Sequence, residues 1–188
     1  FSAAFGTTAG APMYHMVGIT PEAPSLADTL GCRCDVETIY VSGSELLETI
    51  KILDSNHRQD GNDVVDVVAL GNPHLSLNEV SRIANLCQGQ SRYPGVKAIA
   101  TLGRQVHASA QRAGYIDILT SFGFQLINDT CWCMLSQPIV PKTTRQIITN
   151  SGKYAHYANS LIGEDVIVRF SGLEDCMAAA KTGKVPLR

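Results

Sequence analysis

From about residue 36 onward, short β-rich runs alternate with amphipathic helical runs, and this alternation limits the possible folds more than any other feature. The β-rich runs are apolar almost throughout, as is typical of parallel strands covered on both faces. Six runs fit: VETIYVS at 36–42, DVVDVVALG at 63–71, VKAIATLG at 96–103, FQLIND at 124–129, RQIITNS at 145–151 and DVIVRFS at 165–171. The sequence therefore predicts an α/β fold with a parallel or mostly parallel sheet layered with helices.

The runs between the strands predict helices with an apolar stripe on one face. They cover SELLETIKILDSN at 44–56, SLNEVSRIANLC at 76–87, one helix to about residue 113 with a further turn before residue 122, and LEDCMAAAKTG at 173–183. Ser42 with Glu45, and Ser76 with Glu79, have the spacing of capping boxes, which predicts where two of the helices begin. Gly183 is expected to stop the last helix.

Residues 1–35 lack this rhythm and are rich in loop-forming residues, so we expect a lead-in at 1–35 and an α/β catalytic lobe at 36–188. The chain begins with an alanine- and glycine-rich segment and no initiator methionine, which reads like the middle of a longer protein. We therefore expect this sequence to be a fragment.

Charge and hydropathy exclude several classes of partner. The formal net charge is −2 and the basic residues are scattered, so no electrostatic footprint for nucleic acid is present. The apolar runs are too short to span a bilayer, and no charged-then-apolar leader precedes them. These features predict a soluble, cytoplasmic protein that acts on a small molecule, with no nucleic-acid or membrane partner.

The chemically distinctive motifs all follow predicted strands. They are GNPHLS, TLGRQVH, NDTCWC, TNSGKYAHY and SGLED. In an open parallel sheet, ligands bind beyond the carboxyl ends of the strands, where loops and helix N-termini face a crevice. We therefore expect the functional site along this edge of the sheet.

Two of these motifs suit a small anion. In GNPHLS, His74 has the chemistry to donate a proton or hold a carboxylate, although a histidine bonded to its own turn explains the pattern equally well. In TNSGKYAHY, Asn150, Ser151 and Lys153 around Gly152 form a candidate anion cradle. A glycine turn with a helix N-cap at Ser151 is the purely structural alternative.

Two pairs of cysteines raise the question of a metal. Cys131 and Cys133 flank the only tryptophan, and alternate residues of an extended chain point to the same side, which suits one metal centre better than a strained mutual disulfide. Half-buried thiols remain the alternative. A second pair, Cys32 and Cys34, raises a four-thiolate zinc site as a further alternative, although nothing in the pattern brings the pairs together.

Taken together, the motifs VGITPEAPSL, VVALGNPHLSLNE, NDTCWCM, ITNSGKYAHY and RFSGLEDCMAAA resemble the catalytic large-subunit region of the aconitase X family, over nearly the whole chain and in the expected order. The resemblance implies an aconitase-like α/β catalytic region of a hydro-lyase, completed by a swivelling domain or small subunit. It also implies that a catalytic serine on that domain lies outside these residues, so this chain alone is expected to be an incomplete enzyme.

The resemblance further implies a cofactor and site residues. The cofactor is an iron-sulfur cluster (2Fe-2S or 4Fe-4S) or a mononuclear iron, with Cys131 and Cys176 as ligands, Cys133 a less favoured one, and a further ligand upstream of Phe1. Asp129 is expected to orient the cysteine loop. The substrate-binding candidates are Asn72, His74, Asn150, Ser151, Lys153 and His156, and the catalytic candidates among them are His74, Ser151 and Lys153.

The CWCM and SGKYAHY versions of the motifs resemble the hydroxyproline branch of the family. The substrate expected is therefore cis-3-hydroxy-L-proline, dehydrated to pyrroline-2-carboxylate with iron as a Lewis acid. Mevalonate 5-phosphate is the alternative substrate, and a non-catalytic zinc- or ligand-binding α/β module is the alternative of a different class.

Overall fold

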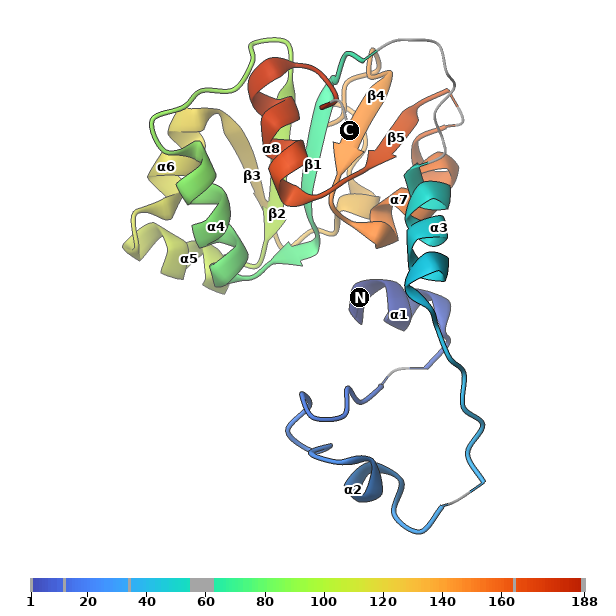
Figure 1. Cartoon of the computed structure of the whole chain (residues 1–188). Helices are drawn as coiled ribbons and strands as arrows, with labels where there is room; N and C mark the ends of the chain where they lie inside the picture. The colour runs from blue at the N-terminus through green and yellow to red at the C-terminus, as the bar shows by residue number, and fades with distance from the viewer. Residues whose placement is uncertain (1, 12, 34, 55–62, 164, 187–188) are drawn as a thin grey trace. The chain divides into compact units, whose positions relative to one another are not determined.

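A computed structural model describes residues 2–11, 13–33, 35–54, 63–163 and 165–186 of the chain (Figure 1). Contacts divide the chain into two compact units, Phe1–Glu48 and Thr49–Arg188. This division falls later along the chain than residue 35, after which the alternation of β-rich and helical runs begins in the sequence. Cys34 and His57 lie outside the described residues.

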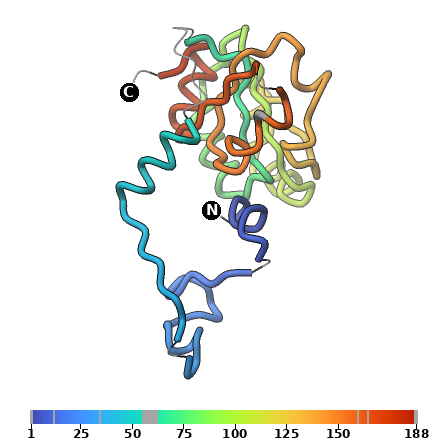
Figure 2. Tube along the Cα trace, turned by 90° about the vertical axis from the view of Figure 1, so that its right-hand side faces the viewer, coloured from blue at the N-terminus to red at the C-terminus, as the bar shows by residue number. Residues whose placement is uncertain are grey.

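The first unit contains two short helices, α1 (Ser2–Thr8) and α2 (Leu26–Leu30), and the beginning of α3 (Gly43–Asp54). The strand expected at 36–42 is not formed, so that prediction was wrong. This segment is an extended trace leading into α3 (Figure 2), and its Ile39 and Tyr40 are 80% and 88% exposed. A β-rich run becomes a strand only where another strand's edge pairs with it, and none of the described strands pairs with this run.

The second unit is built on a five-stranded sheet whose strands all run parallel. The strands are β1 (Val67–Leu75), β2 (Lys97–Leu102), β3 (Phe124–Asn128), β4 (Gln146–Thr149) and β5 (Ile167–Phe170). Their order is β3-β2-β1-β4-β5, so successive connections move outward from β1 in one direction and then in the other. The predicted α/β fold with a parallel sheet is confirmed, and five of the six expected strands are present.

The two faces of the sheet carry different layers. On one face, α4 (Leu77–Cys87), α5 (Arg104–Arg112), α6 (Tyr115–Phe122) and α8 (Leu173–Thr182) enclose one hydrophobic cluster (Figure 1). On the other face, α7 (Gly152–Ile162) and the 3-10 turn η1 (Trp132–Met134) enclose a second cluster. Alternate residues of β1 pack into the two clusters: Val68 and Leu70 belong to the first cluster, and Val67 and Ala69 belong to the second.

The helix boundaries follow local chemistry. Ser76 and Glu79 form the predicted capping box at the start of α4, and Gly183, in the left-handed region at φ 74°, ends α8 as predicted. The expected turn before residue 122 is instead a full helix, α6, because Gly114 and Gly123 both adopt positive φ and bound it cleanly. None of the described helices is long and apolar enough to cross a membrane.

The connections between the strands change direction at β1. β2 and β4 pair with opposite edges of β1, so the chain leaving β1 turns toward β2 and the chain leaving β4 turns the other way, toward β5. Open parallel sheets bind ligands where the connections change direction in this way. The GNPHLS motif was expected to follow its strand, but residues 71–75 form the last part of β1. This part of β1 and the motifs that follow β3 and β4 lie at this edge, and η1 contacts both β1 and α7.

Candidate functional site

The first component of the site is an irregular stretch in β1, where regular pairing with β2 is interrupted between Leu70 and Leu75. Gly71 has a φ of 85°, and a Cβ there would lie 2.3 Å from the carbonyl oxygen of Thr101. The buried Thr101 hydroxyl lies 2.5 Å from the Gly71 carbonyl and 3.0 Å from the Pro73 carbonyl, so it is placed to donate to either one. Residues 71–73, which we call the β1 bulge, are therefore held tightly against β2.

The β1 bulge presents Asn72 to the two thiols that follow β3. The Asn72 amide Nδ2 donates to the Cys133 sulfur at 3.3 Å, and the Cys131 thiol donates to the Asn72 Oδ1 at 3.7 Å. Cys131 and Cys133 are both free thiols, in agreement with the argument against a mutual disulfide. Residues about sixty positions apart in sequence thus meet at the carboxyl ends of β1 and β3.

The β4 end joins the same cluster through Ser151. Its hydroxyl donates to the Asn72 backbone carbonyl at 3.2 Å and accepts from the Tyr154 backbone N–H at 3.2 Å, which caps the start of α7. The Ser151 hydroxyl proton is therefore used in a hydrogen bond to the β1 bulge. The structure therefore gives Ser151 a positioning role, and its catalytic role stays a prediction.

An apolar cluster lies behind the thiols. Trp132 and Tyr154 are each 1% exposed, and their ring centroids are 5.1 Å apart. Burial raises the pKa of the Tyr154 phenol, and the nearby Cys133 raises it further. Burial also raises the pKa of Cys133 itself, against the opposing effect of the Asn72 hydrogen bond. The uncharged thiol of Cys133 is thus favoured until a cation replaces its proton.

Two polar atoms of this cluster have no partner among the described residues. They are the Trp132 Nε1 and the Tyr154 Oη, both N–H or O–H donors. Buried donors of this kind are ordinarily satisfied, so an unsatisfied pair beside two thiols fits a site that holds a further acceptor. Sulfur in iron-sulfur centres is such an acceptor.

Asp129, expected to orient the cysteine loop, contacts Arg104 at the start of α5, and its orienting role stays a prediction. Its carboxylate accepts from the Arg104 backbone N–H at 2.9 Å and forms an ion pair with the Arg104 side chain. These hydrogen bonds hold the pKa of Asp129 below its usual range, with a smaller contribution from the nearby His74. Asp129 adopts a φ of 56°, which turns the chain from β3 toward Cys131. His74 is exposed at the same edge.

The remaining predicted residues are distributed unevenly. Asn150 and Lys153 are half-buried at the β4 end, and the positive charge of Lys153 lowers the pKa of Cys133 slightly against the effect of burial. His156 is exposed on α7, with its ring 4.7 Å from that of Tyr157. Cys176 is fully buried in the cluster under α8, on the opposite sheet face from the cluster that Cys133 contacts. Its ligand role stays a prediction.

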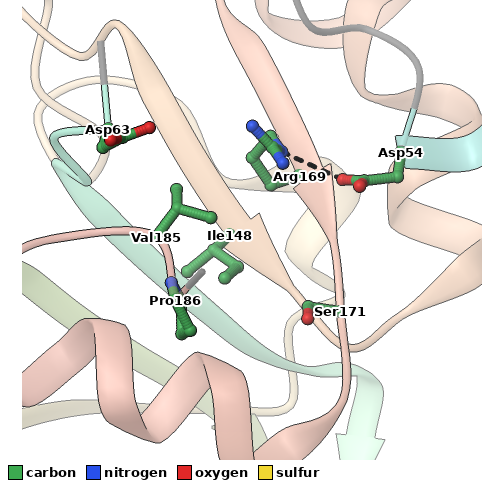
Figure 3. Close-up of a pocket in the computed structure, with 7 residues that line it drawn as sticks. All are labelled: Asp54, Asp63, Ile148, Arg169, Ser171, Val185 and Pro186. Atoms are coloured by element: carbon green, nitrogen blue, oxygen red, sulfur yellow. Dashed lines mark hydrogen bonds and ion pairs between the residues drawn. The ribbon is translucent and has the colours of Figure 1, made fainter. Parts of the chain in front are cut away.

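A separate pocket of about 180 Å³ lies beside β4 and β5 (Figure 3). Asp54 accepts from Arg169 Nε at 3.0 Å and from the Phe170 backbone N–H at 3.0 Å, while the Ser171 hydroxyl donates to Asp175 at 2.5 Å. The Asp54 bonds fasten the end of α3 to β5, and the Ser171 bond links the segment after β5 to α8. The pocket contains none of the predicted site residues, so we place the functional site at the thiols.

Comparison with known protein families identifies the family of this chain. Residues 65–182 match the family model described as the aconitase X third domain, and residues 1–51 match the aconitase X second domain. The chain belongs to the aconitase X family. The resemblance inferred from the motifs is thereby confirmed, and the two matched ranges lie on either side of the residues around 55–62.

Individual members of the aconitase X family agree. The chain is 46% identical over 186 residues to a cis-3-hydroxy-L-proline dehydratase of Pseudomonas aeruginosa, covering 99% of this chain and 31% of that protein. It is 44% identical to the dehydratase of the same name from Hypocrea jecorina, covering 97% and 30%. A phosphomevalonate dehydratase large subunit of Thermococcus kodakarensis is 35% identical, covering 84% and 38%.

A solved member of the aconitase X family shares the fold. The crystal structure of Thermococcus kodakaraensis aconitase X in its holo-form superposes with a TM-score of 0.60 at 32% identity, covering 77% of this chain and 35% of that one. The chain spans about a third of the length of the curated dehydratases it matches.

The donor set fits an aconitase X iron centre in part. Two adjacent thiols are the ligand type that iron-sulfur centres use, and two unsatisfied donors lie in the cluster behind them. Among the described residues, no three His, Cys, Asp or Glu side chains gather in the manner of a complete metal site. Among the described residues, the thiols of Cys131 and Cys133 therefore do not by themselves form a complete metal site.

Sequence reasoning missed three residues of the site. Thr101 reads as an ordinary strand residue, Tyr154 as one member of a polar motif, and Arg104 as a helix start. The available signals were weak: a threonine at the centre of an apolar strand, and an arginine directly after a strand end. Their roles depend on contacts between strands, which a single sequence does not display.

Proposed function

We propose that this chain is part of the catalytic region of a hydro-lyase that removes water from cis-3-hydroxy-L-proline to give pyrroline-2-carboxylate. The single observation that carries the proposal is the convergence of Cys131, Cys133 and Asn72 beside the Asn150–Lys153 loop, in a chain 46% identical to a dehydratase of that name. The lower identity to phosphomevalonate dehydratase, 35%, supports the hydroxyproline substrate over mevalonate 5-phosphate.

The reaction makes three demands on the protein. A proton next to the carboxylate must leave, the electrons of that C–H bond form the double bond, and the C–O bond to the hydroxyl breaks. We assign carboxylate binding to Asn150 and Lys153, because both lie at the N-terminal end of α7. His74 is assigned to give a proton to the departing hydroxyl, so that it leaves as water. The other substrate-binding candidates are Ser151, whose hydroxyl donates to the Asn72 carbonyl, His156, and Asn72, which is considered separately below.

The iron-sulfur cluster or mononuclear iron of this family would be held by Cys131, with Cys133 and Cys176 as the further cysteine candidates in this chain. When bound, iron supplies Lewis-acid polarisation of the leaving hydroxyl. The chain's own part is to hold the substrate carboxylate, to exclude water with the Trp132–Tyr154 cluster, and to supply a proton from His74. A swivelling domain or small subunit is proposed to supply the base. Because the thiols must stay reduced, we place the enzyme in the cytoplasm.

The substrate assay uses the purified full-length enzyme with cis-3-hydroxy-L-proline and, separately, mevalonate 5-phosphate. We expect pyrroline-2-carboxylate from the first and no turnover of the second. Turnover of mevalonate 5-phosphate alone, or stoichiometric zinc without turnover of either compound, would overturn the proposal.

A matched pair of lysine variants tests the carboxylate assignment. Lys153→Ala should raise KM by roughly tenfold to a hundredfold, because a charge-assisted hydrogen bond to a carboxylate contributes about 1.5–3 kcal/mol. Lys142→Ala, at an exposed position outside the thiol edge, should leave KM unchanged. An unchanged KM in Lys153→Ala removes Lys153 from the substrate site.

A further inference from the structure

The β1 bulge is held by more side-chain contacts than a simple turn requires. A side-chain hydroxyl lies within hydrogen-bonding distance of each of its three backbone carbonyls. The Thr101 hydroxyl is placed to donate to Gly71 or to Pro73, and the Ser151 hydroxyl donates to Asn72. Neither hydroxyl is on a surface loop, since Thr101 is 0% exposed and Ser151 is 9% exposed. Neighbouring strands on both sides of β1 therefore fix the backbone of Asn72.

These contacts hold the Asn72 carboxamide between the sulfurs of Cys133 and Cys131. The Asn72 Nδ2 is 3.3 Å from the Cys133 sulfur, and its Oδ1 is 3.7 Å from the Cys131 sulfur. A planar amide whose two ends contact two thiols restricts where both sulfurs lie. With one end of the amide at each sulfur, only the second Nδ2 hydrogen is left to donate to a substrate carboxylate.

We propose that Asn72 is a positioning residue for Cys131 and Cys133, mounted by Thr101 and Ser151, and that it is not a substrate-binding residue. The proposal deepens the proposed function, since it concerns the same thiols. Hydrogen-bond partners of metal ligands orient those ligands, and losing one weakens metal affinity on the order of tenfold to a hundredfold. Asn72 is such a partner for whatever soft cation the two thiols bind.

The test compares Asn72→Ala with Asn150→Ala in the full-length enzyme. Asn150 is the matched control, because it lies at the same edge and carries the same amide without a contact to the thiols among the described interactions. Cadmium is added to the metal-free enzyme, and only the thiolate–cadmium absorption that disappears in Cys131→Ser is counted. We expect cadmium affinity to fall on the order of tenfold to a hundredfold in Asn72→Ala and to be unchanged in Asn150→Ala.

The iron-loaded enzyme provides the second readout. Asn72→Ala should shift the visible absorption and lower the iron content, with KM for the hydroxy acid changed little in the fraction that retains iron. Asn150→Ala should raise KM with an unchanged spectrum. If Asn72→Ala instead raises KM and keeps wild-type cadmium affinity and iron absorption, Asn72 binds substrate and the proposal is wrong.

Further variants guard against simple misfolding. Asn72→Leu keeps the bulk of the side chain without its hydrogen-bonding groups and should match Asn72→Ala. Thr101→Val removes the mounting hydroxyl and should weaken cadmium binding, whereas Thr101→Ser should restore it; equal affinity in these two variants overturns the mounting role of Thr101. Because cadmium binding needs no turnover, the result stands or fails separately from the dehydratase assignment.

Discussion

At the scale of single residues, the site depends on Gly71. Its positive φ and the absence of a side chain let the chain leave β1 directly against Thr101, which brings Asn72 toward the thiols. Thr101 and Ser151 then fix the backbone on either side. The chemistry of the thiols is thus determined by residues that take no part in it.

The most sensitive single position is therefore Gly71. Gly71→Ala should lower the free energy of unfolding by about 3 kcal/mol, since the new Cβ combines a disfavoured φ of 85° with a 2.3 Å approach to the Thr101 carbonyl. Urea denaturation measures the change. Gly103→Ala is the control, because its φ is −70° and nothing lies within 4 Å of the added atom. It should cost under about 1 kcal/mol, and equal effects in the two variants would refute the steric explanation.

At the scale of elements, strand prediction succeeded where the run was buried. The runs that became β1 and β2 are apolar and buried along most of their length, a pattern that predicts parallel strands, whereas β3 and β5 at the edges of the sheet are only partly buried. The run at 36–42 has the same β-forming residues but remains exposed. Propensity reports what a backbone prefers, and only the tertiary structure decides whether another strand's edge is available.

The start of α4 offers a direct test of the capping argument. Ser76→Ala removes the side chain that accepts from the Glu79 N–H, so the free energy of unfolding should fall by about 1 kcal/mol. Thermal unfolding measures it. Ser121→Ala, at an exposed position inside α6, should change stability by less than about 0.5 kcal/mol. A neutral Ser76→Ala would show that the cap does not stabilise α4.

The start of α3 gives a prediction about pH. The Glu45 carboxylate accepts from the Ser42 hydroxyl at 2.6 Å and the Ser42 N–H at 2.7 Å, which lowers its pKa. Because the folded pKa is the lower one, the cap is intact above the ordinary glutamate value and is lost as pH falls through the folded value. Carboxyl-carbon NMR should show Glu45 titrating below its usual range, and Ser42→Ala should raise that midpoint. A midpoint at or above the usual range contradicts the contact.

At the scale of the whole molecule, the edge of the site was predictable and its internal contacts were not. Strand ends carrying histidine, cysteine and lysine pointed to the carboxyl edge of the sheet, where Asn72, Ser151 and the thiols do meet. The order β3-β2-β1-β4-β5 is not readable from the alternation of elements, yet it decides which strand ends are neighbours. Cys131 and Cys176 looked equivalent as strand-end cysteines, but the fold buries Cys176 in the core under α8.

The chain covers about a third of the length of the dehydratases it matches. We propose that residues outside this chain complete the site. The central proposal is that the edge of the sheet that carries Cys131 and Cys133 forms the catalytic centre of the full-length enzyme.

The most direct measurement compares Cys131→Ser with Cys87→Ala in the full-length enzyme. Cys87 is the control because it is buried under α4, where burial raises the pKa of its thiol to about 12. Iron-dependent visible absorption and turnover of cis-3-hydroxy-L-proline are recorded on the same samples. The account predicts that both disappear together in Cys131→Ser and persist in Cys87→Ala. Retention of both in Cys131→Ser would contradict it.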